Sequence, residues 1–94
     1  MEKDIETYVR EKVERMGGKV LKWVCPGNKG VPDRIVLVPG GLICFAEFKD
    51  AGEKPRPLQK WWRKELRKLG FRAVIIEGMA EARLFVDILE EWMQ

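Results

Sequence analysis

Two short apolar runs, separated by a Pro-Gly-Gly turn, constrain the fold of this chain more than any other feature. The runs cover residues 35–38 and 42–46 and contain no alternating polar residues, which is typical of strands buried on both faces. Asp33 precedes the first run, and Glu47 and Lys49 follow the second. Charged groups at the ends of buried strands cost several kcal/mol unless a partner compensates them. A metal ion and a phosphate would compensate all three.

The turn between the runs predicts how they pair. Residues 38–42, Val-Pro-Gly-Gly-Leu, fit a three-residue hairpin loop, with proline at the first corner of a type I turn and the second glycine in the left-handed closing position. The register that follows places Asp33 directly opposite Glu47, with Cβ atoms roughly 4.5–5.5 Å apart. Lys49 then projects from the same face as Glu47. A two-residue Gly-Gly turn would instead put the two carboxylates on opposite faces.

Two carboxylates at this distance repel each other, so one must bind a proton or both must share a cation. Mg²⁺ favours sites with one or two carboxylates, several waters and a substrate phosphate. Lys49 beside such an ion would hold an attacking water or steady the phosphate. A lone Glu-x-Lys in a strand is usually a structural ion pair, but Asp33 in register with Glu47 favours a metal-dependent site here.

The same residues resemble the signature of a known family. The pair Pro-Asp at 32–33, followed after a hairpin by Glu-Phe-Lys at 47–49, is similar to the PD-(D/E)XK nuclease motif. Together with Gly-Val before it and Pro-Leu-Gln at 57–59, it resembles the VRR-NUC branch of small stand-alone phage and bacterial proteins. The resemblance covers nearly the whole chain. It implies an endonuclease that uses Mg²⁺ or Mn²⁺, acts on DNA phosphodiesters and needs no organic cofactor.

The resemblance also implies a role for each matching residue. Asp33 and Glu47 would be metal ligands, together with the backbone carbonyl of Phe48. Lys49 would orient or activate the water, and Gln59 would contact the site from the next helix.

A glutamate of the first helix would complete the cluster. Ile5, Val9 and Val13 determine which side of that helix faces the sheet. Counting about 100° per residue, Glu6 lies at the edge of this side on an ordered turn. Glu2 lies within the same arc, but on a first turn that we expect to fray. We therefore expect Glu6 to take this role, with Glu2 as the alternative.

The 94 residues predict a single domain over residues 1–94. Apolar periodicity and Gly/Pro breaks predict the order αβββαβα, and the resemblance implies a restriction-endonuclease-like α/β fold with a central mixed sheet flanked by helices. The expected helices cover residues 3–16, 58–69 and 80–93, and the expected strands cover 19–24 and 71–77, with the hairpin 33–49 between them.

Composition excludes several other classes. With no histidine in the chain, a Ser-His-Asp triad and His-ligated zinc are excluded. Cys25 and Cys44 lack the spacing that zinc or redox chemistry needs, so we expect both to be reduced and packed. The chain has no run of about 18 apolar residues to cross a membrane, and its densely charged start does not fit a signal peptide. These features predict an intracellular protein, and the resemblance implies the cytoplasm of a bacterium or of a phage-infected host cell.

The charge distribution indicates nucleic acid as the partner. Residues 49–72 contain nine basic and three acidic side chains, whereas the whole chain has a net charge of only +3. In the second helix, Lys60, Arg63, Lys64 and Arg67 fall at i, i+3, i+4 and i+7, which predicts one basic face. We expect this face to contact the DNA backbone in a sequence-independent and salt-sensitive way. A solvated helix face is the alternative.

Apolar stripes on the last two helices remain ambiguous. In the second helix, tryptophans could stack on bases, but we expect core packing for the stripe of Leu58, Trp61, Trp62, Leu66 and Leu69. In the last helix, the stripe of Leu84, Phe85, Ile88, Leu89 and Trp92 either packs on the sheet or supplies a dimer contact. The resemblance implies a homodimer, which would suit two cuts in branched DNA such as a four-way junction or a flap.

Two other functional classes compete with the nuclease. A non-catalytic DNA-binding module would keep the basic helix and lose the site, and a structural accessory protein would bind through the last helix. The presence of Asp33, Glu47 and Lys49 together argues against both.

Overall fold

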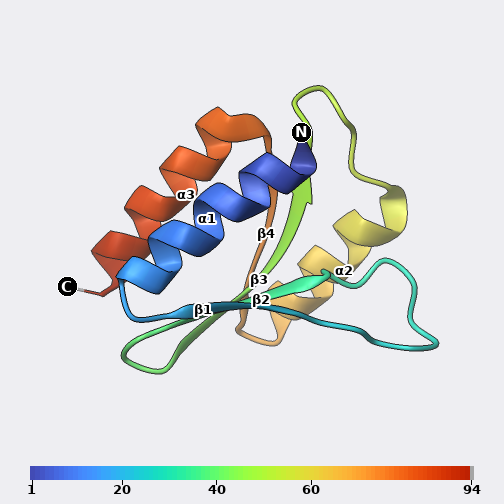
Figure 1. Cartoon of the computed structure of the whole chain (residues 1–94). Coiled ribbons are helices and arrows are strands. Elements are labelled where there is room, and N and C mark those ends of the chain that lie inside the picture. Colours follow the sequence, from blue (N-terminus) through green and yellow to red (C-terminus); the bar gives the residue numbers. More distant parts are fainter. Residues whose placement is uncertain (94) are drawn as a thin grey trace.

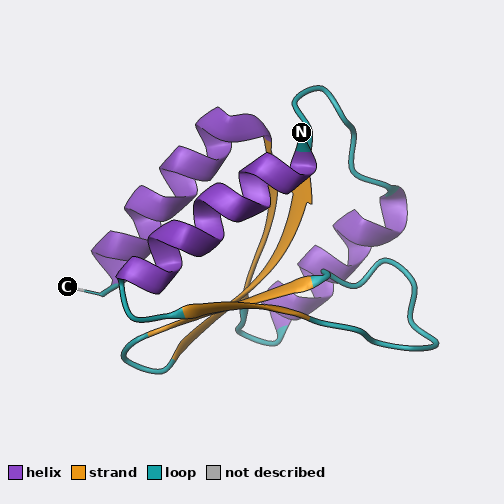
Figure 2. Cartoon of the chain, in the orientation of Figure 1, coloured by secondary structure: helices purple, strands orange, loops and turns teal. Residues whose placement is uncertain are grey.

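The computed structural model describes residues 1–93, and its elements follow the predicted order αβββαβα (Figures 1 and 2). Helix α3 begins directly after the last strand, earlier than predicted, and the first strand ends at Lys22 instead of residue 24. None of the described helices has the length and apolar character needed to cross a membrane. The elements are α1 (Glu2–Arg15), β1 (Lys19–Lys22), β2 (Arg34–Val38), β3 (Leu42–Lys49), α2 (Pro57–Lys68), β4 (Arg72–Glu77) and α3 (Gly78–Trp92).

The strands form one mixed sheet, as predicted, and their order in it is β1-β2-β3-β4. The pairs β1–β2 and β2–β3 are antiparallel, and β4 runs parallel to β3. The hairpin turn allows antiparallel pairing of β2 and β3, whereas β4 is reached through α2, which is the crossover that a parallel pair requires. The carboxyl ends of β3 and β4 therefore lie at the same edge of the sheet.

The register of the β2–β3 hairpin is the predicted one, because Val38 pairs with Leu42 and Arg34 with Ala46. The type I turn was a wrong prediction. Gly40 has φ of +94° and Gly41 has φ of +78°, and a positive φ at the second corner after proline is the geometry of a type II turn. Glycine at both positions accepts this backbone without steric cost, and the loop length, which sets the register, is unchanged.

Helices α1 and α3 lie side by side on one face of the sheet (Figure 1). In α1 the buried residues are Ile5, Val9 and Val13, at the helical spacing seen in the sequence. The even-numbered strand positions face these helices, because side chains alternate along a strand. This layer forms the main core, to which the sheet contributes Val36, Val38, Cys44, Ala46, Phe48 and Ile76.

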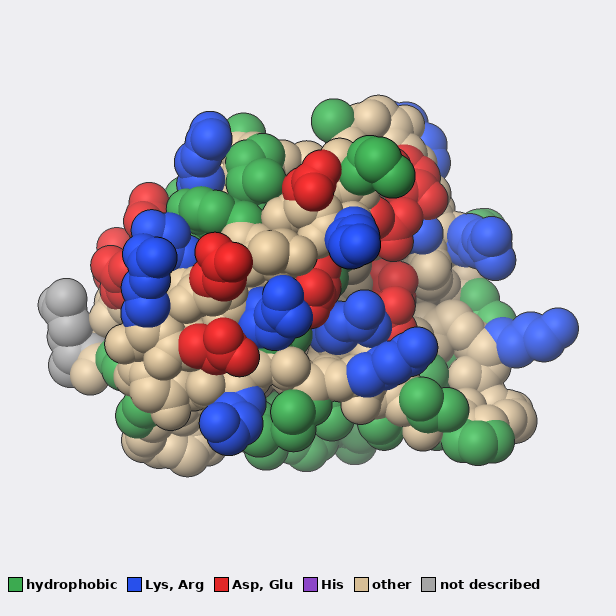
Figure 3. Space-filling view, viewed as in Figure 1, with side chains coloured by type: hydrophobic (Ala, Val, Ile, Leu, Met, Phe, Trp, Pro, Cys, Tyr) green, Lys and Arg blue, Asp and Glu red, His purple; other side chains and the backbone are tan. Residues whose placement is uncertain are grey.

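The opposite face of the sheet is covered only in part, by α2, which packs against β4. A helix about 10 Å wide spans about two strands spaced 4.8 Å apart, so β1 and β2 stay uncovered. Leu21 of β1, Val24 just after it and Ile43 at the start of β3 are 46%, 67% and 39% exposed, and Figure 3 shows hydrophobic side chains along the lower edge of the molecule. The prediction of strands buried on both faces holds only for residues 46–49, at the end of β3.

Candidate active site

Asp33 and Glu47 occupy facing positions at the end of the β2–β3 hairpin. Arg34 and Ala46 form the last pair of the ladder, and Asp33 and Glu47 are the next residues on each strand. Asp33 is anchored on its other side, where its carbonyl accepts a hydrogen bond of 2.8 Å from the backbone N–H of Trp23. The hairpin register thus brings the two carboxylates together as the turn length predicted.

Glu47 is only 7% exposed, and its surroundings disfavour its charge. The pKa of Glu47 is raised to about 7, first by burial and then by the neighbouring charges of Asp33 and Glu2, while Lys49 and a hydrogen bond from the backbone of Asp33 act to lower it. A carboxylate in this environment binds a proton near neutral pH or is neutralised by a cation. Such a raised pKa at converging charges is typical of a functional site.

Lys49 lies on the same face of β3 as Glu47, and its side chain is 8% exposed. Its Nζ lies 3.7 Å from Oε2 of Glu53, which comes from the loop after the strand. That loop is shaped by a hydrogen bond of 3.0 Å from the backbone N–H of Asp50 to Oε1 of Glu53. The ammonium group of Lys49 is therefore held at the edge of the sheet, close enough to Glu47 to act on its pKa.

Glu6 is connected to Asp33 through Arg34. The Nε atom of Arg34 lies 3.9 Å from Oε1 of Glu6, and its Nη1 lies 3.4 Å from Oδ2 of Asp33. The same Nη1 donates a hydrogen bond of 3.1 Å to the carbonyl of Asp33. One guanidinium group thus orients the predicted helix carboxylate and the predicted hairpin carboxylate toward each other.

Glu2 lies in a different acidic group, one turn earlier on α1. One carboxylate oxygen each from Glu2, Asp50 and Glu53 lie within 4.8 Å of one another. Local burial and the charge of Glu53 raise the pKa of Glu2, while Lys49 acts to lower it. Asp50 and Glu53 were not predicted from the sequence, where they are ordinary acidic residues of a polar loop.

A recess of about 250 Å³ joins these groups on the surface. The apolar wall is Phe48, whose side chain faces α1. The polar lining comes from the first turns of α1 and from the start of β2, and consists of Glu2, Lys3, Glu6, Asp33 and Arg34. The recess therefore collects the two candidate helix glutamates and one hairpin carboxylate, with Glu47 and Lys49 buried at its side.

Comparisons with known proteins agree with this geometry. No family model matches the chain. A protein named "Putative nuclease p44", from Acyrthosiphon pisum secondary endosymbiont phage 1, is 41% identical over 77 residues, which cover 82% of this chain and 83% of that protein. A solved structure named "VRR_NUC domain" is 31% identical, with a TM-score of 0.84 over 92% of this chain and 94% of that one. The chain belongs to the VRR-NUC family.

A second solved structure, named "VRR_NUC domain protein", shares the fold of this VRR-NUC chain. It has a TM-score of 0.71 and 20% identity, and the match covers 96% of this chain and 85% of that one. The two structures together confirm the predicted α/β fold class with a mixed sheet flanked by helices.

In this VRR-NUC chain, the first turn of α2 is attached to the loop before Asp33. The indole N–H of Trp62 donates a hydrogen bond of 3.0 Å to the carbonyl of Lys29. Gly30, with φ of +86°, packs so tightly that a Cβ atom would lie 2.7 Å from Cγ of Leu58. Gln59 helps to cap the start of the helix, because its Oε1 accepts a hydrogen bond of 2.8 Å from the backbone N–H of Arg56. Its amide NH₂ group remains available as a donor.

The residues of the predicted basic face of α2 lie in two different surroundings. Lys60 and Lys64 are exposed and Arg63 is half-buried, and within residues 1–93 none of the three takes part in an ion pair. Arg67 instead bends toward the sheet, where its Nε–H donates a hydrogen bond of 2.9 Å to the carbonyl of Ala73. The predicted basic face is therefore open along its first two turns and anchored at its end.

The prediction that the apolar stripe of α2 packs in the core was wrong for most of its residues. Only Leu66 is buried, whereas Leu58, Trp61 and Leu69 are 45%, 49% and 72% exposed. Trp61 and Trp62 pack edge to face, with ring centroids 5.0 Å apart. The reason is the position of α2 over the edge strand β4, where the sheet offers it only a narrow apolar surface.

Proposed function

We propose that this chain is a metal-dependent endonuclease that hydrolyses phosphodiester bonds of DNA. The observation that supports it most is the pair Asp33 and Glu47, with a buried Glu47 whose pKa is raised to about 7 and with Lys49 on the same face. The relative named a nuclease, and the family to which the chain belongs, support the same reaction class.

The donor set fits a hard divalent ion. Two facing carboxylates, one of them buried beside Lys49, have a repulsion that a dication relieves and a proton relieves only in part. Asp33, Glu47 and the backbone carbonyl of Phe48 would hold Mg²⁺ or Mn²⁺, which favour oxygen ligands. Bound there, the ion would supply Lewis-acid polarisation of the phosphate and would make a bound water more acidic.

The side chains around this position have separate roles in the proposed reaction. The Lys49 ammonium, held by Glu53, orients the attacking water and balances the charge that develops on the phosphate. Glu6, held by Arg34, adds a carboxylate to the wall of the recess, with Glu2 as the alternative. Gln59 uses its free amide group to contact the substrate strand from α2.

DNA would reach the site along α2. The exposed Lys60 and Lys64 and the half-buried Arg63, together with Arg67, would neutralise phosphates and release counterions, which makes binding independent of sequence and weaker in salt. The exposed ring of Trp61 beside them gives a base or sugar an apolar surface.

We further propose that the enzyme acts on branched or flapped DNA as a homodimer in the cytoplasm of a bacterium or phage-infected cell. Within the stripe of α3, Phe85 and Leu89 are buried, whereas Leu84 is 59% exposed, so α3 offers a second copy less apolar surface than the sheet does. The uncovered face of the sheet, with Leu21, Val24 and Ile43 exposed, is the apolar surface that a second copy would cover. Two sites in one dimer would suit paired cuts at a junction.

A cleavage assay on labelled linear, flap and four-way DNA tests the proposal. The wild-type chain should cut in Mg²⁺ or Mn²⁺ and stop in EDTA. Asp33→Asn and Glu47→Gln should abolish cutting at nearly constant volume, with unchanged circular dichroism as the control. Cutting at the same rate in EDTA would refute the metal mechanism. Binding without cutting under any divalent ion would identify a non-catalytic DNA-binding module instead.

A further inference from the structure

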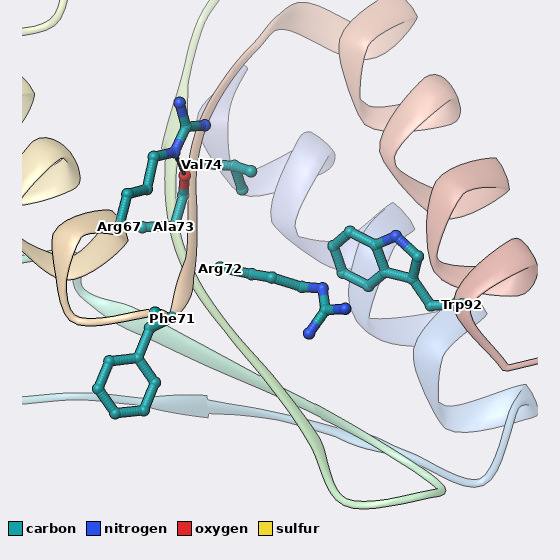
Figure 4. A pocket seen from close by; sticks show the side chains of 7 residues that line it. Arg67, Phe71, Arg72, Ala73, Val74 and Trp92 are labelled. Atoms are coloured by element: carbon teal, nitrogen blue, oxygen red, sulfur yellow. Dashed lines mark hydrogen bonds between the residues drawn. The ribbon is translucent and has the colours of Figure 1, made fainter.

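A second recess lies at the opposite end of β4 from the candidate active site (Figure 4). It has a volume of about 350 Å³ and lies where the end of α2, the start of β4 and the end of α3 meet. Arg72 pairs across the sheet with Cys44, whereas Glu47 pairs with Ile75. At 3.3 Å per residue, the recess therefore begins about 10 Å along the sheet from Glu47.

Two guanidinium groups line this recess, and the chain holds each of them in place. Arg67 uses only its Nε–H, in the hydrogen bond to Ala73, which leaves its four Nη donors free. The guanidinium group of Arg72 lies 4.4 Å from the centroid of the Trp92 ring. Stacking occupies the face of the group and leaves the donors in its plane free. Figure 4 shows Arg72 extended from β4 toward Trp92, and Arg67 reaching the same strand from α2.

The charge of the recess is uncompensated. No acidic side chain lines it, and within residues 1–93 neither arginine takes part in an ion pair. Burial raises the pKa of the Cys44 thiol to about 12, and Arg72 and Arg67 both act to lower it. The two positive charges thus act on the same buried atom behind the recess, and an anion between them would relieve their repulsion.

We propose that this recess binds a backbone phosphate of the DNA substrate, away from the bond that is cut. Planar guanidinium groups with free paired donors match phosphate oxygens, and restrained side chains lose less entropy on binding. The exposed cations Lys60 and Lys64 on α2 lead toward Arg67, so the recess lies at the end of a row of basic side chains. Beside it, Phe71 is 43% exposed and offers a sugar an apolar surface. The inference rests on the proposed function for its choice of DNA.

The experiment must separate this role from a structural one, because Arg72 stacked on Trp92 also places a cation near the end of α3. Fluorescence anisotropy of a labelled duplex in EDTA compares Arg72→Gln with Arg83→Gln, which removes an exposed arginine of α3 outside the recess. Arg72→Gln should weaken binding about tenfold and flatten the salt dependence by about one phosphate contact. Arg83→Gln should change affinity less than about twofold. Equal affinities for the two variants, with or without a lower melting temperature of Arg72→Gln, would overturn the inference.

A second measurement needs no substitution of Arg72. The indole N–H resonance of Trp92, assigned by its loss in Trp92→Phe, is followed in the wild-type chain during titrations with inorganic phosphate, a nucleoside monophosphate and a short oligonucleotide. The oligonucleotide should shift it at the lowest concentration. Equal effects of all three would indicate a free phosphate ligand and overturn the assignment to DNA, and no shift would refute the site. Both measurements omit divalent ions and therefore report binding alone. A chain that binds DNA at this recess but never cuts it would refute the proposed function and leave this inference standing.

Discussion

Replacing Glu47 with glutamine should remove a loss of folding stability that the wild-type chain undergoes as the pH rises. Burial, and then Asp33, raise the pKa of Glu47 from 4.5 to about 7. At about 1.36 kcal/mol per pH unit, ionising this side chain costs the folded chain roughly 3 kcal/mol more than ionising a solvated glutamate. Because the pKa is higher in the folded state than in the unfolded state, the free energy of unfolding is larger by this amount below pH 4.5. The difference is lost as the pH rises through 7.

Urea unfolding in EDTA measures the effect. The free energy of unfolding of the wild-type chain, relative to Glu47→Gln, should fall by roughly 3 kcal/mol between pH 4.5 and pH 8. Glutamine imitates the shape of the protonated side chain, and Glu90→Gln, at an exposed position of α3, is the matched control that should show no such trend. A difference between wild type and Glu47→Gln that stays constant within about 1 kcal/mol would refute the electrostatic reasoning.

A divalent ion bound at Glu47 should offset the same loss of folding stability. At pH 8 and about one hundred times its dissociation constant, Mg²⁺ would stabilise the wild-type chain by about 2.7 kcal/mol. For a domain of this size that corresponds to a rise in melting temperature of roughly 10 °C. Glu47→Gln should show little of this rise in a thermal unfolding scan, and an equal rise in both chains would place the ion elsewhere.

Three further changes test the other parts of the proposed site. Lys49→Ala should stop cleavage while duplex affinity, measured by anisotropy, falls less than about threefold, since one phosphate contact is a small part of the total; a large loss of affinity would make Lys49 a binding residue. Changing Lys60 and Lys64 together to glutamate should weaken binding to all DNA alike and flatten its salt dependence, and unchanged affinity would mean that this face is only solvated. Glu6→Gln should lower the cleavage rate at least tenfold and Glu2→Gln should be nearly silent, and the reverse result would assign the role to Glu2.

Local geometry allowed the hairpin to be read from the sequence alone. A three-residue loop and the two-residue period of a strand leave one register once the loop length is known, so Asp33 opposite Glu47 followed without any tertiary information. The turn type did not follow, because glycine accepts both the predicted negative φ and the observed positive φ at residue 40. The helical spacing of Ile5, Val9 and Val13 likewise identified the buried side of α1.

The sequence did not show which groups from separate elements meet. No role was predicted for Arg34, yet it links Glu6 to Asp33. Glu53 belongs to a polar loop, yet it holds Lys49. These contacts depend on how α1 and the loop after β3 are placed over the sheet edge, which residue spacing along the chain does not encode.

The sequence by itself determined the order of elements, the hairpin register and the identity of the residues at its end, since each depends on neighbours within a few positions. Only the tertiary structure decided which faces are covered. The same apolar pattern on α1 and α2 produced a buried stripe in one helix and an exposed one in the other, because α1 lies against both the sheet and α3, while α2 meets little more than β4. The pKa of Glu47 was decided in the same way, since it depends on burial and on the charges of Asp33 and Glu2, which only the folded chain brings close to it.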